Sequence, residues 1–508
     1  MTIRVGTSLT IDEVVRVARG AAVEIDSDVA ARMGAARAVV EDVVASGDAV
    51  YGITTGLGDL ANVRIETSEA ERLQADIVRS HSTGVGPALP VEVVRAMMLL
   101  KARTFAFGIS GVRFDLVERL VTMLQAGISP AVPSQGSLGA SGDLAQLAHL
   151  AQSLIGEGEV VHQGVVVPAA DALRATGLEP LHLSHKEGLS LVNGTEMMLA
   201  IGILAYDAAS KVARAADLTG AMSVEACLGT DRAFDERVVA LRSHVGAKLV
   251  AANLRSLLAG SEIVASHRES EHLVQDAYSL RCIPQVHGAY RDGLGYVRAM
   301  LEAELASAID NPSVLVDTGE ILSGGNFHGE SLALAMDHLA LCATGFATIA
   351  ERRVARLVDP DLSNGLPAFL TTDPGRRSGF MLAQYTAAAL VSENRSLCFP
   401  ASVDSIPTSA GQEDHVSMGA TAARKAAGIV VNVERVIAIE ALAAAQGLDL
   451  RSPLKPARGT DAARRAIRAV SGYLDEDRSL APDIEAVRDL IASGELSATA
   501  RSATGTLD

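Results

Sequence analysis

The stretch Ser134–Leu150, SQGSLGASGDLAQLAHL, joins three evenly spaced glycines to the start of an apolar run. Its Ala-Ser-Gly at Ala140–Gly142 is one of three copies, the others being Ala45–Gly47 and Ala492–Gly494. The outer copies follow helical patterns, so we expect each to end a helix with its glycine in a left-handed turn. The middle copy precedes an apolar run suited to a helix, and its dense glycines let the backbone bend back on itself.

A backbone that folds back at Ala140 can react with itself. If the Gly142 nitrogen attacks the Ala140 carbonyl and Ser141 loses water, the product is a five-membered ring, 4-methylidene-imidazol-5-one (MIO). Its exocyclic methylene is a strong electrophile, which no ordinary side chain provides. The alternative for these residues is an unmodified flexible loop before a helix.

Seven further segments give the middle copy its context. They are YGITTGLGDLA from Tyr51, RSHSTGVG from Arg79, LVNGT from Leu191, VQDAYSLRCIPQVHGA from Val274, DNP from Asp310, GGNFHGE from Gly324 and QEDHVSMG from Gln412. From about residue 51 to residue 450, this set and its order resemble the histidine ammonia-lyase family. That family belongs to the wider group of aromatic amino acid ammonia-lyases and aminomutases.

The resemblance implies non-oxidative deamination of L-histidine to trans-urocanate and ammonia, with an MIO group and without an external cofactor or metal ion. Ammonia is a poor leaving group and a β-proton beside a carboxylate is weakly acidic, so the reaction needs an electrophile and a well-placed base. The alternatives are an MIO-dependent 2,3-aminomutase, which re-adds ammonia at the β-carbon, and a lyase for another aromatic amino acid. A non-catalytic helical scaffold is the alternative from a different class.

Tyr51 is the candidate base, because it opens a glycine-broken turn able to aim a side chain into a cavity. A tyrosine pKa near ~10 would have to be lowered by positive groups or hydrogen bonds. An ordinary buried tyrosine is the alternative. By resemblance, Tyr51 matches the family's catalytic tyrosine, and Tyr278 matches a residue close to the electrophile.

Arg281 follows Tyr278 by three residues, so the two share a face if the segment is helical, and Gln275 joins that face at the same spacing. A guanidinium binds a carboxylate through two parallel hydrogen bonds, which would fix the substrate's α-carboxylate. A surface salt bridge is the alternative for Arg281. In the family, the matching positions contact substrate or the electrophile.

Four more residues complete the candidate site. Asn193 interrupts an apolar run, where a buried amide needs partners, and the resemblance assigns it to the substrate carboxylate and the electrophile's carbonyl. Phe327 would form a wall of the pocket. Glu413 can accept the imidazole N–H of histidine, which a phenyl ring could not offer. His81 aligns with the histidine-specific branch. A cap or turn residue, a core phenylalanine, a solvated glutamate and a capping histidine are the respective alternatives.

Three positions depart from the family pattern. Thr54 stands where asparagine or serine is usual, Leu57 replaces phenylalanine, and Gln146 replaces the proline after GDLA. Thr54 and Leu57 lie close to Tyr51 in sequence, and Gln146 falls in the first turn of the predicted helix after the middle copy. Because none of these changes removes a reacting group, they bear on the substrate more than on the reaction class.

The composition predicts a mainly α fold. Aromatic residues make up 3% of the 508 residues and tryptophan is absent, which favours closely packed helices over a β-sandwich. Long Ala-rich runs predict a helix bundle, and their apolar circumference predicts an oligomer; the resemblance makes it a homotetramer with shared active sites. We expect a mainly helical domain over 1–200 that carries the MIO loop, with one β-hairpin at Gly158–Pro168, and a helical domain over 201–508. The long runs are 187–227, 328–353, 376–397 and 412–446.

The net charge of −17 argues against a nucleic-acid partner, which calls for a basic face. The first residues show a capping-box pattern, Thr10 with Glu13, and no signal-peptide core. The longest uncharged stretch, 120–142, contains prolines and glycines and is a poor membrane span. The four scattered cysteines have neither metal-binding nor disulfide-framework spacing. These features favour a cytoplasmic enzyme with a small-molecule substrate.

Overall fold

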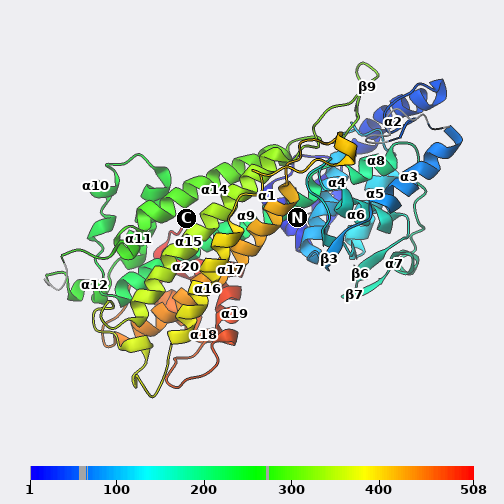
Figure 1. The fold of residues 1–508 in the computed structure, drawn as a ribbon. Helices are drawn as coiled ribbons and strands as arrows, with labels where there is room; N and C mark the ends of the chain where they lie inside the picture. Colours follow the sequence, from blue (N-terminus) through cyan, green and yellow to red (C-terminus); the bar gives the residue numbers. More distant parts are fainter. Residues whose placement is uncertain (1, 57–64, 66, 270–273) are drawn as a thin grey trace. The chain divides into compact units, whose positions relative to one another are not determined.

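The computed structural model describes residues 2–56, 65, 67–269 and 274–508 (Figure 1). The described chain is mainly α-helical, and its few strands form small sheets of two or three strands. It divides into two compact units. The first comprises Met1–Leu204, Ala299–Asp337 and Pro400–Arg424, and the second comprises Ala205–Arg298, His338–Phe399 and Lys425–Asp508. The mainly α fold class is confirmed, whereas the predicted boundary at residue 200 stays a prediction.

The first unit alternates short helices with strands and loops. Its helices are α1 (Ile11–Ala18), α2 (Val29–Ser46), α3 (Thr67–His81), α4 (Val91–Ala106), α5 (Asp115–Gln125), α6 (Leu144–Leu154), α7 (Ala169–Ala175) and α8 (Glu187–Val192). Its strands are β1 (Ile3–Val5), β2 (Val23–Ile25), β3 (Val85–Ala88), β4 (Ile128–Pro130), β5 (Pro133–Gln135), β6 (Glu159–His162), β7 (Val165–Pro168), β8 (Ser313–Leu315) and β9 (Glu320–Leu322).

The sheets of the first unit are local pairings. β1 pairs with β2 in parallel, while β3–β5, β4–β6–β7 and β8–β9 are antiparallel. The predicted hairpin is confirmed as β6–β7, whose two turn residues Gln163 and Gly164 have φ of 51° and 81°. Two central residues with positive φ match the twist of the paired strands. The predicted capping box at Thr10 and Glu13 begins α1.

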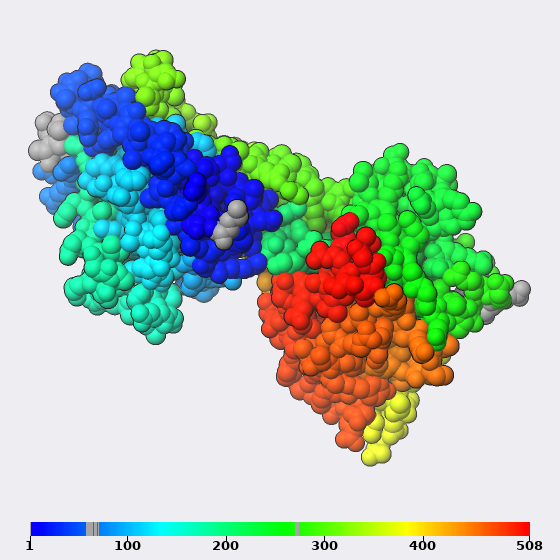
Figure 2. All heavy atoms as spheres, turned by 180° about the vertical axis from the view of Figure 1, so that it is seen from behind, coloured from blue at the N-terminus to red at the C-terminus, as the bar shows by residue number. Residues whose placement is uncertain are grey.

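The second unit is helical. It contains α10 (Glu236–Val239), α11 (Val245–Leu258), α12 (Glu262–Ser266), α13 (Tyr278–Arg281), α16 (Met381–Leu397), α18 (Arg458–Val470), α19 (Ala481–Ser493) and α20 (Glu495–Thr504). The helices α18, α19 and α20 pack against one another and α11 packs against α18 and α20. In Figure 2 the orange and red spheres of the C-terminal segment lie side by side on the face of the second unit that is in view.

Four long helices contain residues of both units: α9 (Glu196–Ala226), α14 (Ile283–Leu305), α15 (Glu330–Val358) and α17 (Gly419–Leu450). The predicted run 187–227 is broken after α8, where Asn193 and Gly194 leave helical geometry and Gly194 has φ of 135°. The predicted helix over 412–446 starts only at Gly419, because Met418 has φ of 55° and its amide bonds to another loop. The run from 376 becomes helical only at Met381.

Apolar residues of the four long helices supply a large part of the buried core. In α17 nearly every residue between Ala438 and Leu448 is buried, in keeping with its Ala-rich sequence. Among the described residues, α15 alone is long and apolar enough to cross a membrane, and 72% of its most apolar window is buried within the structure. Such burial is typical of a core helix.

Candidate active site

The middle Ala-Ser-Gly copy forms a tight reversal immediately before α6. Gly139, Ser141 and Gly142 have φ of 94°, 48° and 83°, all in the left-handed region that a non-glycine residue such as serine rarely occupies. The Gly142 amide donates to the Gly139 carbonyl across the turn at 3.3 Å. The structure therefore places Ala140, Ser141 and Gly142 in the folded-back backbone that the sequence predicts.

A second backbone segment holds this turn from outside. The Gly194 amide donates to the Ser141 carbonyl at 3.2 Å, and the Asp143 amide donates to the Gly194 carbonyl at 2.8 Å. A Cβ added to Gly142 would lie 1.9 Å from the Gly194 oxygen, so only glycine fits there. A chain reversal between Ala140 and Gly142, clasped where no side chain can enter, fits the geometry that closure of an MIO ring needs.

Asp143, which the sequence did not single out, lies buried directly after the turn. Its Oδ2 accepts hydrogen bonds from the Met197 and Met198 amides at 2.8 and 2.9 Å, in the first turn of α9. Its Oδ1 is buried without a hydrogen-bond partner among the described residues. Burial raises the pKa of Asp143 to about 8, and the neighbouring Glu196 carboxylate adds to the shift. The only sequence signal was a charged residue between Gly142 and an apolar run.

Asn193 is buried, and its amide has the partners that burial requires. Its Nδ2 donates to the Asp310 carboxylate at 3.4 Å and to the Asn311 carbonyl at 3.1 Å. The backbone carbonyl of Asn193 accepts a hydrogen bond from the Lys101 ammonium at 2.6 Å. Asp310 and Asn311 of the DNP segment thus hold the Asn193 side chain in place. Asn193 directly precedes Gly194, whose backbone bonds to the turn.

Two buried ion pairs lie next to Asn193 and hold the residues around it in place. Lys186 lies 3.0 Å from Asp310, and Lys101 lies 3.1 Å from Glu196. All four side chains are almost fully buried, where removing one partner would leave an uncompensated charge. Sequence reasoning missed both lysines, because a lone lysine in an apolar helix such as α4 gives no indication of its partner.

His81 is the last residue of α3 and lines the same cavity as Ala140. Its Nδ1 contacts the Ile77 carbonyl at 2.8 Å, so Nδ1 carries the proton and Nε2 is left as an acceptor. The cavity has a volume of about 200 Å³ and is also lined by Ser80, Leu138 and Leu144. The structure therefore places His81 and Ala140 on the wall of one cavity.

The segment that carries Glu413 packs against the turn as well. The Met418 amide donates to the Leu138 carbonyl at 2.9 Å, and a Cβ on Gly139 would lie 2.1 Å from the Ser417 Oγ. Glu413 itself is half-buried and accepts a hydrogen bond from the Thr408 hydroxyl at 2.7 Å. Its carboxylate is thus held by a neighbour within the same segment.

Tyr51 lies half-buried in the turn after α2. The unusual Thr54 ties this turn together, because its hydroxyl accepts from the Val50 amide at 2.9 Å and donates to the Asp48 carbonyl at 2.6 Å. Leu57, the second departure, lies outside the described residues. The third, Gln146, falls in the first turn of α6 as predicted and donates to the Pro133 carbonyl at 3.1 Å.

Tyr278, Arg281 and Gln275 belong to the second unit, whereas the residues above belong to the first. Tyr278 begins α13 and is 71% exposed, and the Arg281 guanidinium lies 4.7 Å from the centre of its ring. Their predicted common face is therefore confirmed. The prediction that Gln275 shares that face is wrong, because the helix begins only at Tyr278, after the extended Ala277.

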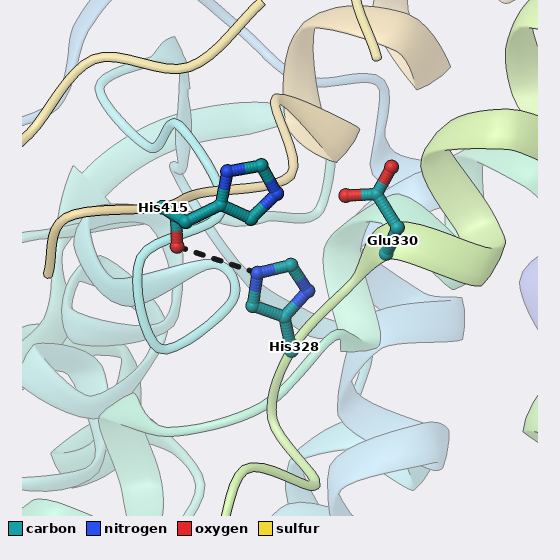
Figure 3. A group of neighbouring side chains, drawn as sticks. All are labelled: His328, Glu330 and His415. Carbon is teal, nitrogen blue, oxygen red and sulfur yellow. Dashed lines mark hydrogen bonds between the residues drawn. The ribbon is translucent and has the colours of Figure 1, made fainter. Parts of the chain in front are cut away.

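Phe327 is half-buried in the loop between β9 and α15. The next residues bring a group of potential metal ligands together: His328, Glu330 and His415 each offer an atom within 4.8 Å of the others (Figure 3). The sequence predicts no metal site, because His415 stands far along the chain from the other two.

Comparison with known proteins agrees with this geometry. The family described as aromatic amino acid lyase matches residues 9–469. Histidine ammonia-lyase of Anaeromyxobacter sp. (strain K) is 53% identical over 500 residues, covering 97% of this chain and 98% of the relative. Histidine ammonia-lyase of Gloeobacter violaceus is 50% identical over 504 residues, covering 99% and 98%.

Solved structures are similar along the whole chain. The structure of histidine ammonia-lyase from Trypanosoma cruzi has a TM-score of 0.91 at 42% identity and covers 99% of this chain and 96% of that one. Tyrosine aminomutase from Streptomyces globisporus has a TM-score of 0.94 at 39% identity, with 100% of each chain covered. With the family match across most of its length, the chain is a carbon–nitrogen lyase that belongs to the aromatic amino acid lyase family.

Proposed function

We propose that this enzyme deaminates L-histidine to trans-urocanate and ammonia, using an MIO group that forms from Ala140, Ser141 and Gly142. The observation that carries the proposal is the shared cavity of about 200 Å³, in which His81 lies beside Ala140. A histidine at the wall suits a substrate whose ring carries polar nitrogens. The histidine ammonia-lyases at 50–53% identity support the same substrate.

The turn supplies the conditions for autocatalytic ring closure. The Gly142 nitrogen attacks the Ala140 carbonyl carbon, whose oxygen leaves as one water molecule when the ring closes, and loss of the Ser141 hydroxyl as a second water molecule leaves the methylene. Gly142 is clasped by Gly194 where no side chain fits, which holds the reversal before any bond forms. Once formed, MIO would supply an electrophile for the substrate's amine, as the reaction requires.

The chain's side chains would divide the remaining tasks. Tyr51 removes the β-proton as the general base, and the Arg281 guanidinium binds the α-carboxylate. Asn193, held by Asp310 and Asn311, positions the carboxylate from the other side. Tyr278 lies close to the electrophile, and Gln275 and Phe327 complete the substrate pocket.

The imidazole ring would be recognised by His81 and Glu413. His81 Nε2 is an acceptor in the tautomer that Ile77 selects, and the Glu413 carboxylate accepts the second polar hydrogen of a cationic imidazole. A phenyl substrate would leave both groups without a partner, which costs binding free energy. The preference for histidine thus follows from polar groups that an imidazole satisfies and a phenyl ring does not.

We also propose that the enzyme is a homotetramer whose active sites combine residues of different subunits. Tyr278 is 71% exposed, which suits a residue that completes a neighbour's site. Large apolar side chains are also exposed on α14, α15 and α16 of the second unit, which suits a protein interface. They include Tyr296, Leu341, Leu382 and Tyr385.

Subunit mixing tests the shared site. Hybrids of Tyr278→Phe and Ser141→Ala subunits should recover part of the activity that each homomeric variant lacks, because a site that takes Ser141 from one subunit and Tyr278 from its neighbour can then contain both intact residues. A monomer that remains fully active at low concentration would contradict the assembly. We place the tetramer in the cytoplasm, in keeping with four cysteines that form no disulfide bond among the described residues; cell fractionation would check this.

The 2,3-aminomutase remains a second candidate, supported by the similarity to tyrosine aminomutase at 39% identity. The deciding experiment incubates purified enzyme separately with histidine, tyrosine and phenylalanine and identifies the products by mass spectrometry. Urocanate and ammonia from histidine alone are expected. A β-amino acid product would establish the aminomutase, and turnover of tyrosine without histidine would overturn the substrate assignment while keeping the reaction class.

A further inference from the structure

We propose that His328, Glu330 and His415 bind a divalent transition-metal ion of the Zn²⁺ class. Their ligand atoms lie within 4.8 Å of one another, and all three residues belong to the first unit. Ligands about 2.0–2.2 Å from a zinc ion lie up to roughly 3.5 Å apart. A closure of about one ångström, within reach of side-chain rotation, would therefore complete three-point coordination.

The two imidazole rings are oriented for this role. They lie parallel, with an interplanar angle of 5° and centroids 5.9 Å apart. His328 Nε2 contacts the His415 carbonyl at 3.4 Å, so Nε2 carries the proton and Nδ1 keeps its lone pair. In Figure 3, His328 Nδ1 and one nitrogen of His415 lie on the side that faces the Glu330 carboxylate. A carbonyl that fixes the tautomer of a ligating histidine is a usual outer partner of metal sites.

Close backbone packing holds the two ligand-bearing segments together. A Cβ on Gly329 would lie 2.5 Å from the Met198 Sδ and 3.2 Å from the Ser417 Oγ, so the backbone between His328 and Glu330 packs directly on these atoms. The Val416 amide, next to His415, donates to the Ser405 hydroxyl at 3.0 Å. The ligands are thus brought together by the fold, before any ion binds.

The donor set selects the type of ion. Two neutral imidazoles and one carboxylate suit Zn²⁺, Co²⁺ or Ni²⁺, whereas Mg²⁺ and Ca²⁺ prefer oxygen ligands throughout. His328 and Glu330 are half-buried and His415 is exposed, so an ion can enter and keep water in its open positions. Bound metal would tie the start of α15 to the segment that packs on Gly139 through Ser417.

Metal binding can be measured without any assay of turnover. Chelator-treated enzyme is titrated with Zn²⁺ by calorimetry, alongside His415→Ala, Glu330→Ala and the control His182→Ala, which removes an exposed histidine of the same unit. We expect one Zn²⁺ per chain in the wild type and in the control, and at least tenfold weaker binding in the other two. Equal binding by all four proteins, or no binding by the wild type, would overturn the proposal.

A second readout identifies the ligands and covers a misfolded variant. X-ray absorption of the Zn²⁺-loaded wild type should show two imidazoles and no sulfur in the coordination shell. Hydrogen exchange should slow on Zn²⁺ addition at the amides of residues 412–418, which the ion would hold to α15. Sulfur in the coordination shell would assign the ion to cysteines and would overturn the proposed site. Unchanged hydrogen exchange at these amides would overturn it as well.

Discussion

The sequence Ala-Ser-Gly-Asp occurs at residues 45–48 and again at 140–143, with different structures. In the first copy, Ser46 is the last residue of α2 and Gly47, with φ of 71°, ends the helix. The Ser46 hydroxyl donates to the Val43 carbonyl at 3.0 Å and contacts the exposed Asp48 carboxylate at 2.8 Å. This copy is an ordinary helix C-terminus.

In the second copy the serine itself is left-handed, with φ of 48°, and the aspartate is buried. Gly142 contacts the Gly194 backbone so closely that a Cβ would lie 1.9 Å from its oxygen. Asp143 accepts the first amides of α9 instead of facing solvent. Identical residues thus acquire different chemistry from the backbone packed around them, here the turn at Asn193 and Gly194.

Removing the serine hydroxyl should produce the largest difference in effect between the copies. Ser141→Ala should lower histidine turnover by about a thousand-fold or more, because no side chain could then form the methylene. The controls Ser46→Ala and Ser493→Ala should keep activity close to the wild type, since these hydroxyls lie at helix ends. Urocanate absorbance measures turnover and circular dichroism checks the fold. Equal activity in all three variants would break the comparison.

Adding one methyl group tests the clasp around the turn. Gly142→Ala should lower the free energy of unfolding by about 2–5 kcal/mol, from the left-handed φ and the clash with Gly194. Gly494→Ala, at the third Ala-Ser-Gly copy, should cost only about 1–2 kcal/mol, because the nearest atom to its Cβ is a lysine Cε at 4.0 Å. Urea denaturation compares the two variants. Equal losses in the free energy of unfolding would mean that Gly142 is not packed closely against Gly194.

Glu413 lies on the segment that packs on the second copy, so its substitution should change substrate choice. Glu413→Gln should lower kcat/KM for histidine about ten- to a hundred-fold, the effect of losing a charge-assisted hydrogen bond of about 1.5–3 kcal/mol. Turnover of a phenyl substrate should change far less, and His81→Leu should shift preference in the same direction. Asp414→Asn, at the exposed neighbour, is the matched control. A uniform loss across substrates would refute ring recognition.

The buried aspartate gives the second copy a pH dependence of stability. Its pKa is 3.8 as the ordinary value and about 8 when buried, so the folded chain retains a proton that the unfolded chain has lost between these values. The stabilisation is complete below pH 3.8 and disappears as the pH rises to about 8, at up to about 1.4 kcal/mol per pH unit. Asp143→Asn should flatten this component in denaturation curves recorded from pH 5 to pH 8. An unchanged slope would contradict the raised pKa.

Local patterns predicted the parts of the fold that depend on neighbouring residues. The capping box at Thr10, the hairpin turn at Gln163–Gly164 and the helix-ending glycines at 47 and 494 are all confirmed. The predictions that were wrong concern features that depend on distant contacts or on where a helix begins. The helix predicted from residue 412 begins only after Met418, whose amide bonds to Leu138 beside the turn, and Gln275 lies before the helix that carries Arg281.

In the candidate site, too, some residues could be predicted from the sequence and others depend on contacts that only the fold makes. The resemblance named residues for each task, and the structure brings His81 and Ala140 to one cavity. The resemblance could not name Lys101, Lys186 or Asp143, because a buried charged residue is recognised only by the partners that the fold brings to it. The grouping of His328 with His415 likewise depends on packing between segments far apart in sequence.

Only the second copy should become an electrophile, and intact-mass spectrometry of the active wild-type enzyme can measure this. The chain mass should fall short of the sequence mass by two water molecules, and peptide mapping should confine the deficit to the fragment containing Ala140, Ser141 and Gly142. Fragments with the copies at 45–47 and 492–494 should have their full mass. An active enzyme with the full sequence mass throughout would contradict the account.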